Sequence, residues 1–258
     1  MEGAVQIVAT VFDLGSLIKE NIGLVIAAAL IIGVPVGFSF LMFLTALWEK
    51  RHIRRLAPLP QDRVDKVPPK SFERVIELQE DGLQDLGLFT DGDKGIMEGI
   101  VSVMIAPAGD VVAYVIHSKL NRRVRFYTRL ADTRWIITSD MTTTTDLSGL
   151  QDQEMLPNVP PSVLLKYHRD RLYDVKDSID PFDPVTVIED FYARDYEVAD
   201  KLEELGYIHY LTPDRDVYRH TAAGAWRIST HFLRSTGKID EQTKRAKARK
   251  KAWQAKHG

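Results

Sequence analysis

The stretch Ile22–Trp48, IGLVIAAALIIGVPVGFSFLMFLTALW, contains no charged residue. A transmembrane helix needs about 20 apolar residues, because each residue adds 1.5 Å along the helix axis. The stretch is therefore long enough to cross a bilayer. No basic segment precedes it and no small-x-small cleavage site follows it, which favours an uncleaved signal-anchor over a signal peptide. The sequence predicts one transmembrane helix over residues 22–48.

The charges on the two sides of this predicted span differ in sign. Residues 1–21 carry a net charge of −2, whereas four basic residues follow the span closely: Lys50, Arg51, Arg54 and Arg55. Loops rich in Lys and Arg stay in the cytoplasm. We therefore expect a single-pass protein of the cytoplasmic membrane with its N-terminus outside and its C-terminal domain in the cytoplasm. The four basic residues are expected to bind anionic lipid headgroups.

Two features beside this charge pattern concern the membrane. Pro35 lies between Gly33 and Gly37, so a kink is expected, and the small residues would permit close contact with a second copy or a protein partner. Glycine and proline are also simply commoner in membrane helices than in soluble ones. Residues 4–18 are apolar but interrupted by a charge and a glycine. They are expected to lie on the membrane surface as an interfacial helix.

Composition sets bounds on the rest of the chain. The protein has 258 residues, of which 45% are hydrophobic and 27% are charged. About 200 residues follow the anchor, enough for one ordinary domain or two small ones, and the composition is that of a folded protein. There are no cysteines, which excludes disulfides, thiolate metal sites and cysteine nucleophiles, and fits a reducing compartment.

A basic tail ends the sequence. Residues 237–258 contain eight Lys/Arg and two Asp/Glu, a net charge of +6, which leaves −8 for the remaining residues. Such a tail suggests an anionic partner, either lipid headgroups or nucleic acid, the alternative being a solvated tail without a partner. The residues expected to bind this partner are Lys244, Arg245, Lys247, Arg249, Lys250 and Lys251.

The fold class predicted for the whole chain is α+β. It comprises one N-terminal transmembrane helix, a small antiparallel β-meander with helices, and a helical segment with a β-hairpin that is winged-helix-like. The expected segments are an interfacial or extracytoplasmic segment 1–21, the span 22–48, a basic then proline-rich linker 49–70, a meander domain 71–156, a helical and hairpin domain 157–236, and the tail 237–258.

Alternating apolar residues predict the meander. In Arg123–Leu130, Val124 and Phe126 fall on one face and Arg125 and Tyr127 on the other, which indicates an antiparallel sheet with one wetter face. The helices before and after the meander are expected to cover its apolar side. The four expected strands are Gly99–Ile105, Val111–His117, Arg123–Leu130 and Trp135–Asp140.

Helical spacing and turn residues predict the elements of the second part. Two helices are expected, Ser162–Lys176 and Val185–Leu205, with Gly206 ending the second. A hairpin of Tyr207–Leu211 and Val217–His220 follows, and Thr221 could cap a last helix, Ala222–Leu233.

The segment Lys201–Trp226, KLEELGYIHYLTPDRDVYRHTAAGAW, resembles the end of a winged-helix domain. The matching residues are Leu202, Leu205, Gly206, Tyr207, Tyr218, Arg219, Thr221 and Gly224. The resemblance implies a winged-helix module over 162–234 and a nucleic-acid partner. The alternative is a helix–hairpin–helix packing or dimerisation unit, since Tyr192–Glu204 is acidic and Val185–Leu205 lacks a Gly or Pro turn. Overall the chain resembles single-span, membrane-anchored proteins of bacteria.

No catalytic motif is present, and the seven histidines show no metal-ligand spacing. We predict no catalytic residue, metal or cofactor. His117 and His168 fall on apolar faces and are expected to be buried core histidines. A cluster around one strand turn could hold an anion, but surface ion pairs are the simpler explanation. That cluster comprises Arg129, Asp132, Arg134 and Asp140.

Three hypotheses for the function follow. The leading one is a non-enzymatic membrane-anchored protein whose cytoplasmic domain binds a partner or self-associates through the span or the helical domain. The second is a membrane-tethered winged-helix regulator that binds nucleic acid. The third is an enzyme without a recognisable motif.

Overall fold

The computed structural model describes most of the chain after the centre of the predicted span. Most of that span, the interfacial segment 4–18, Arg54 and nearly all of the basic tail lie outside the described residues. No helix within the described ranges is both long and apolar enough to cross a membrane. The described residues are 36–53, 55–65, 67, 69–91, 99–117, 123–140, 146–157, 159–230, 248, 251 and 255.

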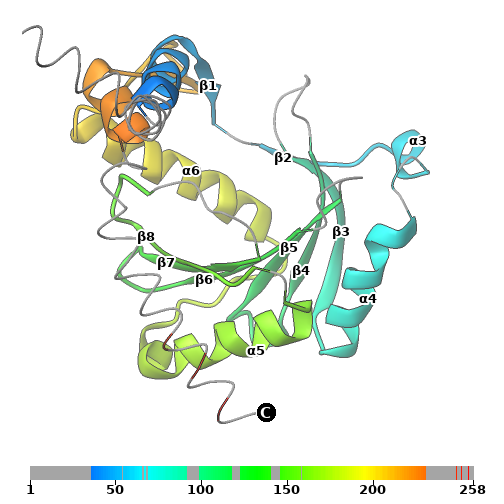
Figure 1. Cartoon of the computed structure of the whole chain (residues 1–258). Helices are drawn as coiled ribbons and strands as arrows, with labels where there is room; N and C mark the ends of the chain where they lie inside the picture. The colour runs from blue at the N-terminus through cyan, green and yellow to red at the C-terminus, as the bar shows by residue number, and fades with distance from the viewer. Residues whose placement is uncertain are drawn as a thin grey trace, which may run out of the picture.

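The fold is α+β, as predicted, and is built on a seven-stranded sheet (Figure 1). All neighbouring strands are antiparallel except β7 and β8, which are parallel. The predicted meander is confirmed as β4 to β7, and the sheet extends beyond it on both sides. In spatial order the strands are β2 (Leu56–Pro58), β3 (Gln84–Asp91), β4 (Gly99–Ile105), β5 (Val112–His117), β6 (Arg123–Arg129), β7 (Trp135–Ser139) and β8 (Gln151–Met155).

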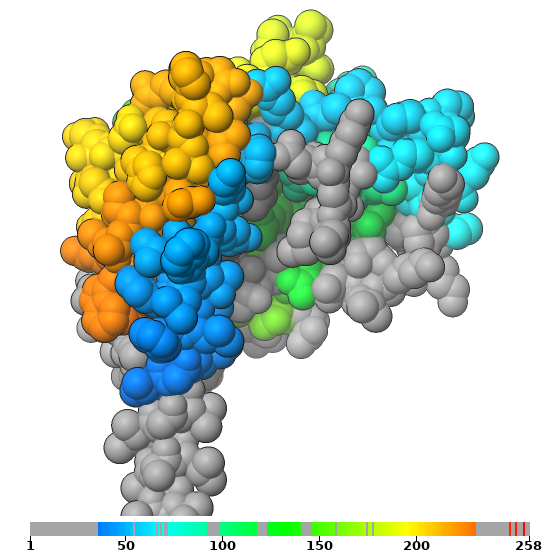
Figure 2. Space-filling model, turned by 90° about the horizontal axis from the view of Figure 1, so that it is seen from above, coloured from blue at the N-terminus to red at the C-terminus, as the bar shows by residue number. Residues whose placement is uncertain are grey.

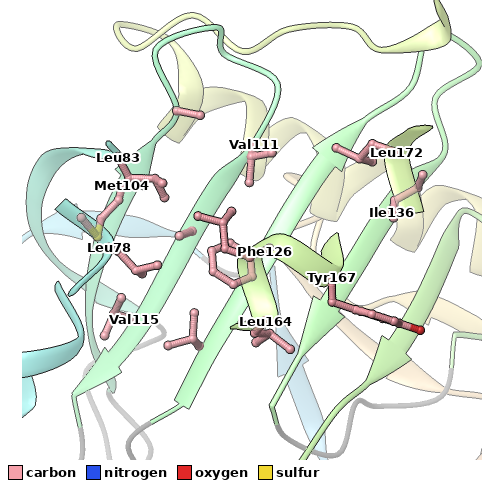
Figure 3. Close-up of a cluster of buried hydrophobic side chains, with 14 of the residues drawn as sticks. Leu78, Leu83, Met104, Val111, Val115, Phe126, Ile136, Leu164, Tyr167 and Leu172 are labelled. Carbon is pink, nitrogen blue, oxygen red and sulfur yellow. The ribbon is translucent and has the colours of Figure 1, made fainter. Parts of the chain in front are cut away.

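Helices cover both faces of this sheet. On one face lie α4 (Glu73–Glu80) and α5 (Pro161–Leu172), the helices before and after the meander, as predicted (Figure 1). Figure 3 shows Phe126 of β6 in their shared core, with Leu164 of α5 and Leu78 of α4. All three side chains are fully buried. The burial of apolar side chains such as these is the main source of stability in a domain of this kind.

The other face of the sheet is not the solvent-exposed side that the alternation at Arg123–Leu130 suggested. Helix α6 (Val187–Glu204) lies across it (Figure 1). Phe191 of α6 packs with Tyr114, Tyr127 and Trp135 of the sheet, at ring-centroid distances of 4.6 to 5.0 Å. The sheet is therefore buried on both faces, which explains why its strands carry large apolar or aromatic residues at successive positions.

A second, three-stranded sheet has the order β1-β10-β9. Strands β9 (Ile208–Tyr210) and β10 (Val217–His220) confirm the predicted hairpin. Gly206, which ends α6, has a φ of +71°, the left-handed conformation expected after a helix. The C-terminal end of α6 packs against this sheet through Ala199 and Leu202.

The segment 49–70 is not a separate stalk. Its β1 (Lys50–His52) pairs with β10, and its β2 (Leu56–Pro58) pairs with β3. The prolines that suggested a linker are compatible with this, because β2 is an edge strand where a missing N–H is tolerated. Two short elements complete the segment, α3 (Gln61–Val64) and the 3-10 turn Pro69–Phe72.

Two further helices border the small sheet. Residues 36–48 are helical, within the predicted span, and 222–230 form the last described helix. As predicted, Thr221 caps the latter, its hydroxyl accepting a hydrogen bond from the Gly224 N–H at 3.2 Å. Phe43 and Trp226 join the two helices by an edge-to-face contact at 6.3 Å. A 3-10 segment, Tyr173–Ser178, extends α5.

Candidate functional site

A cavity of about 530 Å³ lies between the two sheets. Its walls come from the large sheet, from α6 and from strands β1 and β10, while Met42 and Ile228 line it from the two bordering helices. Figure 2 shows a hollow beside the blue N-terminal residues, with green residues of the sheet within it. Small-molecule sites in proteins have volumes of about 300 to 1,000 Å³, so the cavity is large enough for an organic ligand.

The side of the cavity formed by the large sheet and α6 carries apolar side chains together with a tyrosine and an arginine. Ile116, Ile137 and Phe191 supply apolar surface. Tyr114 and Arg125 also line the cavity, and they are direct partners in the pairing of β5 with β6. Directly paired residues project on the same face of a sheet, so the hydroxyl and the guanidinium belong to one wall.

The Tyr114 side chain is 7% exposed, and its hydroxyl has no hydrogen-bond partner. Burial, followed by the neighbouring Tyr127, raises its pKa well above the usual value. The phenol therefore stays protonated and is available as a donor. Leaving a buried polar group unpaired costs about 1–3 kcal/mol, so this hydroxyl marks a place where a ligand or water would be stabilised.

Arg194 enters the cavity from α6 and is 8% exposed. Its guanidinium lies over the Trp135 ring at 4.6 Å, a cation–π contact. Nη1 lies 3.3 Å from the Asp195 carboxylate, while Nε and Nη2 have no hydrogen-bond partner. The guanidinium of Arg194 is therefore held in position by packing against Trp135, and two of its nitrogen atoms donate no hydrogen bond.

Arg125 is the least compensated cation of the cavity. Its Nε is buried without a hydrogen-bond partner, and no ion pair joins it to a described residue. The opposite wall adds Arg51 of β1, whose Nη2 pairs with Glu49 at 3.0 Å and whose Nε is unpaired. Beside it, burial and the charge of Arg51 lower the pKa of His220 to about 4, so this imidazole is neutral.

Three aspartates also line the cavity: Asp91, Asp146 and Asp195. Asp146 is committed to its own loop, since it accepts hydrogen bonds from the Ser148 N–H, the Ser148 hydroxyl and the Gln151 N–H. Asp195 faces Arg194. Three arginines and three aspartates therefore line the cavity. Of the three arginines, Arg125 is the one without an ion pair to a described residue.

The basic residues predicted to flank the membrane have several environments. Lys50 is exposed and Arg51 lies in the cavity wall. Arg55 forms an ion pair with Asp216 at 2.5 Å and lies over the Tyr192 ring at 5.0 Å. This contact raises the pKa of Arg55. The Tyr196 hydroxyl, followed by Arg55, lowers the pKa of Asp216. Arg55 therefore holds the chain to β10 and α6.

Arg54 and most of the basic tail residues predicted to bind an anion lie outside the described part of the chain. Lys251 alone of the tail residues Lys244, Arg245, Lys247, Arg249, Lys250 and Lys251 is described, as an exposed helical position.

The residues predicted around the strand turn do not form one anion site. Arg129 pairs with Asp180 at 2.7 Å and with Asp190 at 3.2 Å. Arg134 pairs with Asp132 at 2.7 Å, which lowers the pKa of that aspartate. The remaining member, Asp140, pairs with Arg74 at 2.6 Å. The ion-pair interpretation of this cluster is confirmed.

The two histidines predicted to be buried are core residues. His168 is fully buried, and its ring nitrogens lie 3.0 Å from the Thr128 hydroxyl and 2.7 Å from the Thr138 hydroxyl. His117 shares a hydrogen bond of 2.7 Å with Ser102. Among the described residues, no group of three or more His, Asp or Glu is arranged to hold a metal ion.

The cavity was not found by sequence reasoning. Arg125 and Tyr127 were assigned to a wetter face because they alternate with apolar residues, and Arg194 was not singled out within the acidic helix Tyr192–Glu204. The signal that was missed is the aromatic content of that face: Tyr114, Tyr127 and Trp135 are too large and apolar for a solvated sheet.

Comparison of the chain with protein-family models, with curated proteins and with solved structures found no match.

Proposed function

We propose that this protein is a single-pass membrane protein whose α+β domain is a binding module held close to the cytoplasmic face of the membrane. The observation that carries the proposal is the surface of the helix over residues 36–48. Its exposed large apolar residues are Val36, Phe38, Phe40, Leu41, Met42, Leu44 and Trp48, and Trp48 is 71% exposed. Apolar surface of this extent, continuous in sequence with residues 22–35, suits a lipid environment.

The junction between this helix and the domain supports a position beside the membrane. Trp48 ends the helix, and after Glu49 the strand β1 begins at Lys50. Tryptophan followed by basic residues is typical of the cytoplasmic interface of a membrane helix. Since β1 is part of the small sheet and lines the cavity, the helix joins the domain without a spacer.

The cavity supports a role in binding. It combines an apolar wall with buried donors in fixed positions, the composition expected of a small-molecule site. Arginine and protonated tyrosine supply hydrogen-bond donors to a bound ligand.

The described helices α5 and α6 do not support a winged helix that binds nucleic acid. Helices α5 and α6 lie on opposite faces of the large sheet (Figure 1). Helix α6 runs unbroken for 18 residues, without the turn that would separate two winged-helix helices. Its exposed positions include Glu197, Asp200 and Glu204, and such charges are repelled by phosphate. Nucleic-acid binding is therefore not proposed.

The anchor is tested by extraction of membranes from cells that express the full chain. Wild-type protein should remain in the membrane pellet after alkaline carbonate treatment. In the double variant Ile31→Lys, Ile32→Lys each charge costs about 2.5–3.5 kcal/mol at the centre of a span, so the protein should move to the supernatant. The matched variant Ile31→Leu, Ile32→Leu should behave as wild type. Release of the wild-type protein by carbonate would contradict the proposal.

A further inference from the structure

The cavity between the two sheets contains more donors than the protein itself satisfies. The hydroxyl of Tyr114, Nε and Nη2 of Arg194 and Nε of Arg125 and Arg51 all lack hydrogen-bond partners. All four residues line the same cavity. Native proteins leave few buried polar groups unpaired, and each such group calls for an explanation. A ligand with several acceptor atoms would satisfy these donors together.

The charges facing the cavity favour an anion. Arg51 is paired with Glu49, and Arg194 is partly compensated by Asp195. Asp146 is occupied by its own loop. Asp91 and the neutral His220 also line the cavity. Arg125 has no ion-pair partner among the described residues, so a bound anion would complete the charge balance at this point.

Tyr114 defines where the anionic group would bind. It is paired with Arg125 across β5 and β6. Burial and Tyr127 chiefly raise its pKa, and the charges of Asp91, Asp195 and Arg194 also act on it. A carboxylate or phosphate at this place would accept from a phenol and from two guanidinium groups. Hydrogen bonds between a charged donor and a charged acceptor are the strong ones.

The rest of the cavity indicates that the anion carries an apolar body. Ile116, Ile137 and Phe191 line it near Tyr114, and Val198 and Leu202 continue the apolar wall along α6. A volume of about 530 Å³ exceeds what an inorganic ion fills. Burial of apolar ligand atoms against this wall would add affinity.

We propose that the cavity is a binding site for a small organic anion, a carboxylate or phosphate group on an apolar or aromatic body. Arg125, Arg194 and Tyr114 bind the anionic group, and the wall around Phe191 contacts the body. This inference rests on the proposed role of the domain as a binding module, but it does not depend on the membrane anchor.

The test measures binding to the full-length protein in detergent micelles by calorimetry, with phenylphosphate, phenylacetate, inorganic phosphate and benzyl alcohol as probes. At least one of the two aromatic anions should bind, and the stronger of the two identifies the anionic group. Inorganic phosphate lacks the apolar body and benzyl alcohol lacks the anionic group. Each should therefore bind at least about tenfold more weakly than the better aromatic anion. If benzyl alcohol bound as tightly as the aromatic anions, the inference of an anion site would be overturned. The proposed role of the domain as a binding module would still stand.

Variants locate the site. Arg125→Gln should weaken aromatic-anion binding by about tenfold, because it removes one charge-assisted contact. Tyr114→Phe keeps the shape of the side chain and should weaken binding by about threefold, through the loss of one hydrogen bond. It should not lower the unfolding temperature of the ligand-free protein, since the lost hydroxyl has no partner. Arg134→Gln, on the exposed turn beside Asp132, is the matched control and should bind as wild type. Equal affinity in the wild type, Arg125→Gln and Tyr114→Phe, or no binding by either aromatic anion, would overturn the proposal.

Discussion

The imidazole of His168 lies between two threonine hydroxyls beneath α5, and its neighbours fix its tautomer. Nη1 of Arg171 donates to the Thr138 hydroxyl at 2.8 Å, and the Thr128 hydroxyl donates to the Asp110 carbonyl at 2.6 Å. The Thr138 proton is then directed to Nδ1 of His168, and Nε2–H donates to Thr128. In this arrangement the ring is neutral, with Nε2–H as its donor and Nδ1 as its acceptor.

Stability should therefore fall as the solution is acidified. Burial, aided by Arg171, lowers the pKa of His168 well below 6.5 in the folded protein. Below pH 6.5 the unfolded chain binds the proton and the folded chain does not, so the free energy of unfolding falls by about 1.4 kcal/mol per pH unit for each such histidine. The contribution is fully present above pH 6.5 and is lost as the pH falls through this window. His117, with its pKa lowered to about 4 chiefly by burial, adds to the slope.

Urea unfolding of the full-length protein at pH 7.5 and 5.5 measures this effect. The variant His168→Gln should have a smaller difference between the two pH values than the wild type. The exposed His209 provides the control, and His209→Gln should leave the difference unchanged. An equal pH dependence in His168→Gln and wild type would show that this imidazole is not kept neutral.

At the scale of elements, β7 and β8 are parallel, so a short hairpin cannot connect them. Contacts from another element can hold the two strands together. Arg171 of α5 provides such contacts, with a side chain only 4% exposed. It donates to the Ile137 carbonyl at 2.8 Å and to the Asp152 carbonyl at 3.2 Å, one on each strand. It also lies 3.1 Å from the Asp152 carboxylate. One cation thus joins the helix to both strands.

Replacement of this arginine should be costly. Arg171→Leu leaves the Ile137 and Asp152 carbonyls without their donor, and a buried polar group left unpaired costs about 1–3 kcal/mol. The Asp152 carboxylate is 64% exposed, so water can replace the arginine there. Arg169 is exposed on the same helix, so Arg169→Leu should change the free energy of unfolding by less than about 0.5 kcal/mol. Equal effects of the two variants in urea unfolding would contradict the role assigned to Arg171.

At the scale of the whole molecule, strands far apart in sequence meet in the small sheet. Lys50 of β1 is paired with Arg219 of β10, which places the helix over 36–48 beside the last described helix. The cavity thus shares walls with the membrane-proximal part of the chain, through Met42 and Arg51, and with the large sheet. A ligand bound there would contact all of these elements at once.

The sequence predicted local structure well and long-range pairing poorly. Strands β4 to β7 and the hairpin were found because alternation and turn residues are local signals. Strands β1 and β2 are three residues each, and their partners lie elsewhere in the chain, so no local pattern marks them. The involvement of Arg129, Asp132, Arg134 and Asp140 in ion pairs and the burial of His117 and His168 were also predicted. The cavity was not predicted, because it forms where α6 crosses the sheet and brings Arg194 and Arg125 to the same cavity. Periodicity does not reveal that crossing.

The claim that the domain is tethered at the cytoplasmic face of the membrane is tested most directly by cysteine labelling, since the chain contains no cysteine of its own. The variants Gly3→Cys and Tyr173→Cys place one thiol before the predicted span and one on the domain, where Tyr173 is 74% exposed. In intact spheroplasts, a membrane-impermeant maleimide should label Gly3→Cys, and should label Tyr173→Cys only after permeabilisation. Both variants should be labelled fully in detergent. Labelling of Tyr173→Cys in intact spheroplasts would contradict the proposed orientation and with it the cytoplasmic role of the domain.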